Sequence, residues 1–114
     1  MVKPKSPELV YTEVDRQFYD KFLKDRMPRK ILDFHIHLNL PEHIPEISEE
    51  RLHSDWAFES GLILPCEKAA EYGQRLFPDS DYAMAGFPWP NKEADLKLNK
   101  QYLMEKKTEG LVCP

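Results

Sequence analysis

The sequence predicts an α/β fold in which short parallel strands alternate with helices. Two stretches, 30–38 and 81–87, combine β-branched, aromatic and small apolar residues as buried strands do, and a shorter apolar run lies at 111–113. Helical periodicity marks the segments between these stretches. Because strand, helix and strand in this order form right-handed parallel units, we expect about three parallel strands with intervening helices.

One helix is expected before the first strand, within an N-terminal segment of residues 1–29. Residues 1–11 contain two prolines and little periodicity, so we expect them to form an arm. Thr12 can cap the helix, with Asp15 in the capping-box position, and the helix should end near Met27, before the next proline. Its expected packing stripe is Val14, Phe18, Phe22 and Leu23.

Three further helices are expected over residues 48–59, 66–77 and 91–107. The first has a serine cap and is stopped by Gly61, and the second starts after Pro65. Asparagine caps the third, and lysines near its end suit the helix dipole. The expected packing faces are Leu52, Trp56 and Ala57 in the first helix, Ala69, Gly73, Leu76 and Phe77 in the second, and Ala94, Leu98 and Tyr102 in the third.

Composition and charge argue against several classes of protein. Sixteen Lys and Arg against twenty Asp and Glu give a net charge of −4, without the clustered basic face of a nucleic-acid-binding protein. No stretch approaches the ~20 apolar residues that span a bilayer, and the N-terminus lacks the apolar core of a signal peptide. Cys66 and Cys113 do not make a disulfide framework. We therefore expect a cytoplasmic protein without a nucleic-acid or membrane partner.

The strand at 30–38 carries the candidate site. Read with period two, one face holds Ile31 and then three ionisable residues, Asp33, His35 and His37. Burying an acid and two imidazoles is costly unless something pairs with them. Histidines at i and i+2 of a strand lie ~6.5–7 Å apart at Cα, so both rings can reach one divalent ion. Asp33 would then support the ligands or anchor the strand. The alternative is a set of buried polar groups without a metal.

The motif Asp33-Phe34-His35-Ile36-His37 resembles the Asp-x-His-x-His signature on the first barrel strand of the amidohydrolase superfamily, whose members are metal-dependent hydrolases and decarboxylases. The context is similar to the amidohydrolase-related branch: a helix ending in a proline, a short basic step and then the strand, as in 27–33. A Phe-Pro-Trp-Pro run at 87–90, followed by a helix, is also similar to that branch. The resemblance spans most of the chain, but only the His-x-His segment is specific.

This resemblance implies the N-terminal part of a (β/α)8 TIM barrel. Residues 30–114 would form the first βα units of an incomplete barrel, and residues 1–29 the arm and covering helix that precede it. A closed eightfold barrel typically needs ~250 residues, and this chain has 114. We therefore expect an N-terminal segment of a longer protein. The alternative is that the resemblance misleads about the whole fold.

The resemblance also implies a site and a chemistry. His35 and His37 would bind a divalent metal, most often zinc. The enzyme would act on a small carbonyl or carboxylate substrate, either hydrolysing a C–N, ester or lactone bond or removing a carboxyl group. Further ligands would lie on later strands, so this chain alone is expected to be inactive. His43, in the loop after the first strand, and Trp89, after the second, are expected in the substrate pocket. Solvent exposure of His43 and simple packing of Trp89 are the alternatives.

Two other functions stay open. Uronate isomerases begin their barrel with a similar strand after a helix, so a sugar-acid isomerase is one of them. The other is a non-catalytic α/β interaction module in which Asp33, His35 and His37 are only buried polar groups. Open sheet edges and uncovered apolar helix faces predict a homo-oligomer.

Overall fold

The structure, a computed structural model, describes residues 1–87 and 95–106. At its centre is a parallel pair of strands, β1 (Lys30–His37) and β2 (Asp81–Phe87). The other elements, in chain order, are α1 (Glu13–Phe18), η1 (Tyr19–Leu23) and η2 (Lys24–Arg26) before β1; η3 (Pro41–His43), α2 (Glu49–Ser54), α3 (Trp56–Ser60) and α4 (Cys66–Leu76) between the strands; and α5 (Leu96–Glu105) after β2. The predicted alternation of helices and parallel strands is confirmed for these two strands. The predicted third strand at 111–113 lies outside the described residues.

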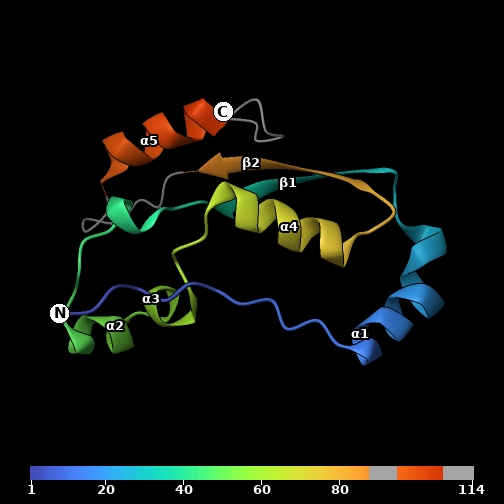
Figure 1. Cartoon of the computed structure of the whole chain (residues 1–114), viewed down its shortest axis with the longest axis horizontal. Coiled ribbons are helices and arrows are strands. Elements are labelled where there is room, and N and C mark those ends of the chain that lie inside the picture. Colours follow the sequence, from blue (N-terminus) through green and yellow to red (C-terminus); the bar gives the residue numbers. More distant parts are fainter. Residues whose placement is uncertain (88–94, 107–114) are drawn as a thin grey trace.

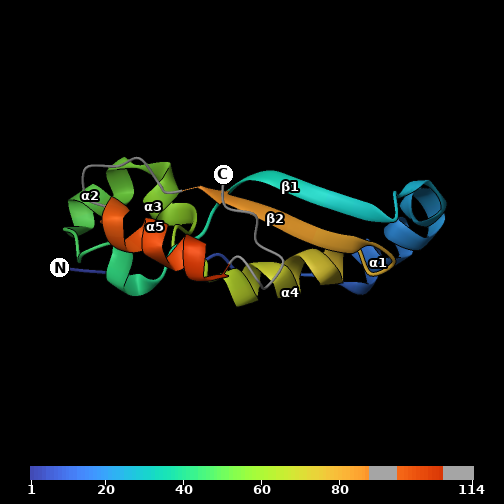
Figure 2. The same cartoon turned by 90° about the horizontal axis from the view of Figure 1, so that it is seen from above.

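The strand pair is covered on one face. Figure 2 shows α4 running beside the strands, and α5 contributes to the same core. That core consists of Leu38, Cys66, Ala69, Met84, Tyr102 and Leu103. On β1, Leu32 and Phe34 are instead 54% and 72% exposed, so they belong to the uncovered face. The described part of the chain contains no helix long and apolar enough to cross a membrane.

The N-terminal helix begins as predicted but does not continue as one α-helix. The predicted pairing of Thr12 with Asp15 is present: the backbone N–H and the hydroxyl of Thr12 donate to the Asp15 carboxylate at 2.7 and 2.8 Å. After α1 the chain passes through the wider turn of η1 and the tighter turn of η2. The prediction that Val14, Phe18 and Phe22 pack is wrong, because half or more of each side chain is exposed. Figure 1 places α1 at the end of the molecule where both strands begin.

The predicted helix over 48–59 is two helices. Asp55 has an extended backbone (φ −134°). Its carboxylate accepts from the N–H of Ala57, and this bond caps the start of α3. This break changes the helical register, so Leu52 and Ala57 are buried as predicted but Trp56 is 77% exposed. Gly61 ends α3 with φ +129°, as its predicted role as a stop requires.

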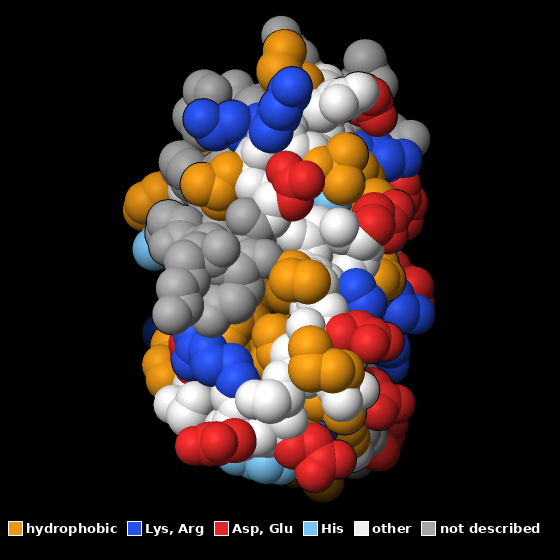
Figure 3. All heavy atoms as spheres, turned by 90° about the vertical axis from the view of Figure 1, so that its left-hand side faces the viewer, with side chains coloured by type: hydrophobic (Ala, Val, Ile, Leu, Met, Phe, Trp, Pro, Cys, Tyr) orange, Lys and Arg blue, Asp and Glu red, His pale blue; other side chains and the backbone are white. Residues whose placement is uncertain are grey.

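A second core forms where the N-terminal arm meets α2 and α3. Phe58 is its centre, surrounded by Ile44, Ile47, Leu52, Leu62 and Ile63. The arm, expected to lack regular structure, is held to this core by backbone hydrogen bonds: Val2 pairs with Ile47, and the N–H of Lys5 donates to Phe58. Figure 3, which looks onto this end of the molecule, shows acidic and basic side chains intermixed with apolar ones.

Candidate metal-binding site

A β-bulge near the C-terminal end of β1 sets the direction of the two histidines. Asp33 pairs with Met84 and Ile36 with Gly86, so β1 advances three residues where β2 advances two. Residues paired across a parallel sheet share a face. Ile36 therefore lies on the covered face with Asp33 and Met84, and His37, the next residue, points to the opposite face. The prediction that Asp33 shares one face with both histidines is wrong, because the extra residue reverses the alternation between them.

Asp33 is bonded to the strand backbone and to β2. Its carboxylate accepts from the N–H of His35 at 3.2 Å and from the hydroxyl of Tyr82 at 2.9 Å. Burial and the bond to Asp33 raise the pKa of the Tyr82 hydroxyl, which therefore stays a donor. The first of these bonds spans the bulged segment and the second ties it to β2. Support of the metal ligands by Asp33 stays a prediction, and in the structure this residue is bonded within the bulged segment and to β2.

The rings of His35 and His37 lie side by side at the C-terminal end of β1. Their centroids are 5.4 Å apart and their planes cross at 78°. A zinc–nitrogen bond of about 2.0–2.1 Å puts each ring centroid about 3.2 Å from the ion, and a tetrahedral angle then separates two centroids by about 5.2 Å. The observed spacing fits two imidazoles on one ion. His35 is exposed and His37 is half-buried, so the pair is accessible from the uncovered face.

The segment that follows His37 is fixed by a buried polar network that includes His43. The side-chain amide of Asn99, on α5, donates to the carbonyl of Leu38 at 2.7 Å and to Asn39 Oδ1 at 3.0 Å. Its Nδ2 also lies 3.0 Å from Nδ1 of His43, which accepts from the N–H of Leu40 at the same distance. Asn39, His43 and Asn99 are fully buried. The alternative of a solvent-exposed His43 is therefore wrong, and its role as a substrate contact stays a prediction.

Sequence reasoning missed Asn39 and Asn99. Asn99 precedes the buried Tyr102 and Leu103 by three and four residues, so helical spacing alone placed it on the packed face of α5. Asn39 carried no comparable signal, because it follows the strand in an irregular segment. Trp89, the other predicted pocket residue, lies outside the described residues.

The buried network predicts that stability depends on pH through His43. Burial lowers the pKa of His43 from 6.5, against the opposing effect of Glu42 and Asp95, and a proton on Nδ1 would face two donors. The unfolded chain therefore binds more protons than the folded chain below pH 6.5. The free energy of unfolding should have its full value above pH 6.5. Below that pH it should fall, by up to about 1.4 kcal/mol per pH unit.

Urea unfolding at pH 7.5 and 5.5 measures this effect. We expect His43→Gln to remove most of the loss, whereas His53→Gln, at an exposed histidine on α2, should keep it. An equal loss in wild type and His43→Gln would contradict the prediction. The carboxylates with lowered pKa values do not affect the comparison of pH 7.5 with pH 5.5, because they titrate below this range.

The described residues supply two clear ligand candidates at this place. Among residues 1–87 and 95–106, no group of three or more His, Cys, Asp or Glu side chains is arranged to hold a metal ion. Comparison with known proteins gives no relative: no family model, curated protein or solved structure matches the chain.

Proposed function

We propose that this chain supplies the paired histidines of a divalent-metal site to a metal-dependent hydrolase or decarboxylase of the amidohydrolase type. The observation that carries the proposal is the spacing of His35 and His37, whose ring centroids lie 5.4 Å apart at the C-terminal end of a strand in a parallel unit. In parallel α/β proteins, substrates bind at this end of the strands. The uncovered face onto which His37 points would be the barrel interior.

Each neighbouring group has a part in holding the pair. A bound divalent ion would polarise a substrate carbonyl and make a bound water more acidic. Asp33 keeps the bulge that turns His37 away from the packed core. Asn99 fixes the backbone immediately after His37 through the Leu38 carbonyl. Because a catalytic zinc site usually has three protein ligands, we propose that the remaining ligands lie outside residues 1–87 and 95–106 and that the chain alone is inactive.

Zinc titration tests the metal site directly. In long-range proton–nitrogen NMR spectra of the imidazoles, we expect the ring signals of His35 and His37 to shift together as zinc is added. His35→Asn and His37→Asn should each weaken zinc binding by at least about tenfold, because each removes one of two ligands. Zinc should also raise the melting temperature of wild type and have little effect on that of either variant.

The matched control is His53→Asn, which removes an exposed imidazole from α2. It should bind zinc as wild type does. Zinc stabilisation that survives in both His35→Asn and His37→Asn would refute the metal site and favour a non-catalytic module. Turnover of a lactone or amide by the 114-residue chain with zinc, abolished by His35→Ala, would refute its inactivity.

A further inference from the structure

The N-terminal arm is bonded to segments that are far from it in the sequence. Val2 and Ile47 exchange two backbone hydrogen bonds of 2.7 Å. Three residues later, the N–H of Lys5 donates to the carbonyl of Phe58 at 3.3 Å, and the carbonyl of Lys5 accepts from the N–H of Ile63 at 3.1 Å. Figure 1 shows the arm running past α2 and α3 toward α1. The arm is therefore built into the fold at this end of the molecule.

Close packing fixes the register of residues 2–7, which we refer to as the strap. Pro4 is buried. Pro7 lies so close to Gly61 that a Cβ on the glycine would be 2.8 Å from Cα of the proline and closer still to its nitrogen. The hydroxyl of Tyr72, on α4, donates to the carbonyl of Pro7 at 3.3 Å. Sliding the strap along the second core would break all of these contacts.

The side chain of Lys3 joins the strap to the loop after β1. Its Nζ donates to the carbonyl of Ile44 at 2.7 Å and to the carbonyl of Pro41 at 2.9 Å. These residues are the first residue of η3 and the residue directly after it, and between them lies the buried His43. Hydrogen bonds from an ammonium group are stronger than those from a neutral donor. Lys3 therefore holds both ends of this turn to the strap.

The segment between α3 and α4 connects the strap with Asn39, two residues after His37. The N–H of Ile63 donates to the strap, while the carbonyls of its two neighbours, Leu62 and Leu64, each accept from Asn39 at 3.1 Å. One of these bonds comes from the backbone N–H of Asn39 and the other from its side-chain amide. The strap thus reaches the segment after β1 directly and through this connection.

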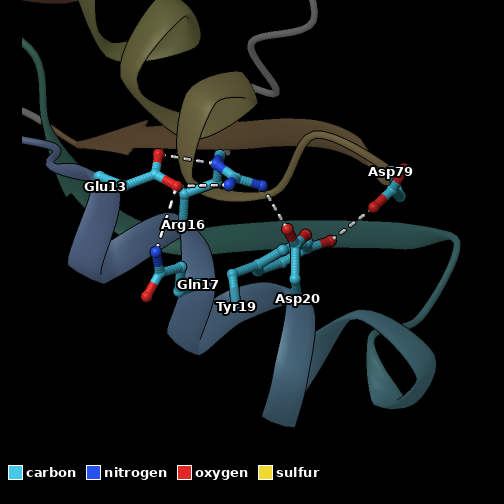
Figure 4. Close-up of polar contacts among 6 residues, drawn as sticks. All are labelled: Glu13, Arg16, Gln17, Tyr19, Asp20 and Asp79. Atoms are coloured by element: carbon cyan, nitrogen blue, oxygen red, sulfur yellow. Dashed lines mark hydrogen bonds and ion pairs between the residues drawn. The ribbon is translucent and has the colours of Figure 1, made fainter.

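The strand pair has anchors that do not involve the strap. Val2 packs on the second core, whereas the strands belong to the core that they share with α4 and α5. Beyond the strap, the hydroxyl of Tyr19 donates to Asp79 at 3.0 Å and ties η1 to the turn before β2 (Figure 4). Directly before β1, the carbonyl of Arg29 accepts from the N–H of Asp81 at 2.7 Å. Release of the strap should therefore leave the strand pair folded.

We propose that the strap is a conformational latch for residues 38–44, the segment after the candidate metal ligands, and that the ammonium group of Lys3 closes it. With Lys3 on its two carbonyls, the segment is held in one conformation. Removing this charged donor lets residues 38–44 open locally while β1 and β2 stay paired. The latch depends only on the contacts described, and its connection to metal binding rests on the proposed function. A metal ion that needs the closed segment would in turn favour the closed latch.

Amide hydrogen exchange of the metal-free chain, followed by NMR, tests the latch because it reports local opening at each residue. Lys3→Met should speed exchange of the N–H groups of Asn39 and His43 by about tenfold, since both carbonyls lose a charged donor. Lys3→Arg keeps the charge and should remain close to wild type. The matched control is Lys5→Met, the same change at an exposed lysine of the strap that is bonded through its backbone. It should leave these exchange rates unchanged.

Two results would overturn the latch. One is equal exchange at Asn39 and His43 in Lys3→Met and Lys5→Met. The other is exchange in Lys3→Met that rises as much in β1 and β2 as at these two residues, because that pattern reports a general loss of stability.

Zinc separates the latch from the proposed function. If the metal site needs the closed segment, zinc at about 100 times its dissociation constant should slow exchange at Asn39 and His43 by up to about 100-fold. Zinc that binds but leaves these rates unchanged would overturn the connection between the latch and the site. A wild-type chain that binds no zinc would refute the metal site, and the metal-free exchange rates would still decide the latch.

Discussion

Asn99→Asp should destabilise the folded chain by about 4 kcal/mol, because it places a carboxylate among three acceptors in the interior. The amide nitrogen of Asn99 now faces the Leu38 carbonyl at 2.7 Å, Asn39 Oδ1 at 3.0 Å and His43 Nδ1 at 3.0 Å. An aspartate of the same shape has no hydrogen to offer any of them. Rotating the side chain does not help, because either oxygen then faces the same groups.

Urea unfolding at pH 7.5 measures the loss, with two variants for comparison. Asn99→Ala also leaves the three acceptors without their donor but adds no charge, so we expect a smaller loss of about 2–3 kcal/mol. Lys100→Ala changes the exposed neighbour on α5 and should stay within about 0.5 kcal/mol of wild type. If Asn99→Asp and Lys100→Ala proved equally stable, the network would not be a main support of this region.

Asn99→Asp should also affect the candidate metal site, through the backbone. Asn99 is bonded to the carbonyl of Leu38, the residue directly after His37. In the fraction of molecules that remain folded, Asn99→Asp should therefore also weaken zinc binding. Asn99→Ala at low temperature separates the two effects, since it keeps more of the chain folded.

Local sequence signals predicted the elements whose causes are local. The capping box of Thr12 and Asp15, the positive φ of Gly61 and the alternation at the start of β1 each depend on a few neighbouring residues, and each is present. The parallel pairing of β1 and β2 also followed, because it is the usual outcome of a strand, a helical connection and a strand.

What sequence analysis missed depends on contacts between distant segments. The bulged segment of β1 is bonded to β2 through Tyr82, which is 49 residues from Asp33. His43 is buried because Asn99, 56 residues later, reaches its ring. Periodicity cannot indicate such partners, since it reports only which positions of one element face inward. The exposure of Trp56 also depends on a side-chain contact, here with a near neighbour, because the carboxylate of Asp55 starts a new helix.

Gly73→Val should cost about 3 kcal/mol, because α4 crosses β2 too closely for a side chain at this position. A Cβ at Gly73 would lie 2.7 Å from Cζ of Tyr82 and closer still to Cδ1 and Cε1. The ring cannot easily move away. It stacks on Phe77 with a centroid separation of 6.1 Å, and its hydroxyl is bonded to Asp33 at 2.9 Å. The better helix propensity of valine offsets only a few tenths of a kcal/mol.

A double-mutant cycle isolates this steric conflict. In a Tyr82→Ala background the ring is gone, so Gly73→Val should be close to neutral and the coupling energy about 2–3 kcal/mol. Glu71→Val, at an exposed position of α4, provides the control for valine in the helix. Additive effects of Gly73→Val and Tyr82→Ala would show that the ring is not what limits residue 73.

Gly73→Val also tests whether the bulge depends on Tyr82. A displaced ring withdraws its hydroxyl from Asp33, and Asp33 then loses its bond to β2 while keeping the N–H of His35. If this bond maintains the bulge, the alternation of β1 relaxes and the histidine rings leave their 5.4 Å spacing. Zinc binding by the folded variant should then fall together with stability. Unchanged zinc binding would mean that the Asp33 carboxylate and the His35 backbone hold the bulge without help from β2.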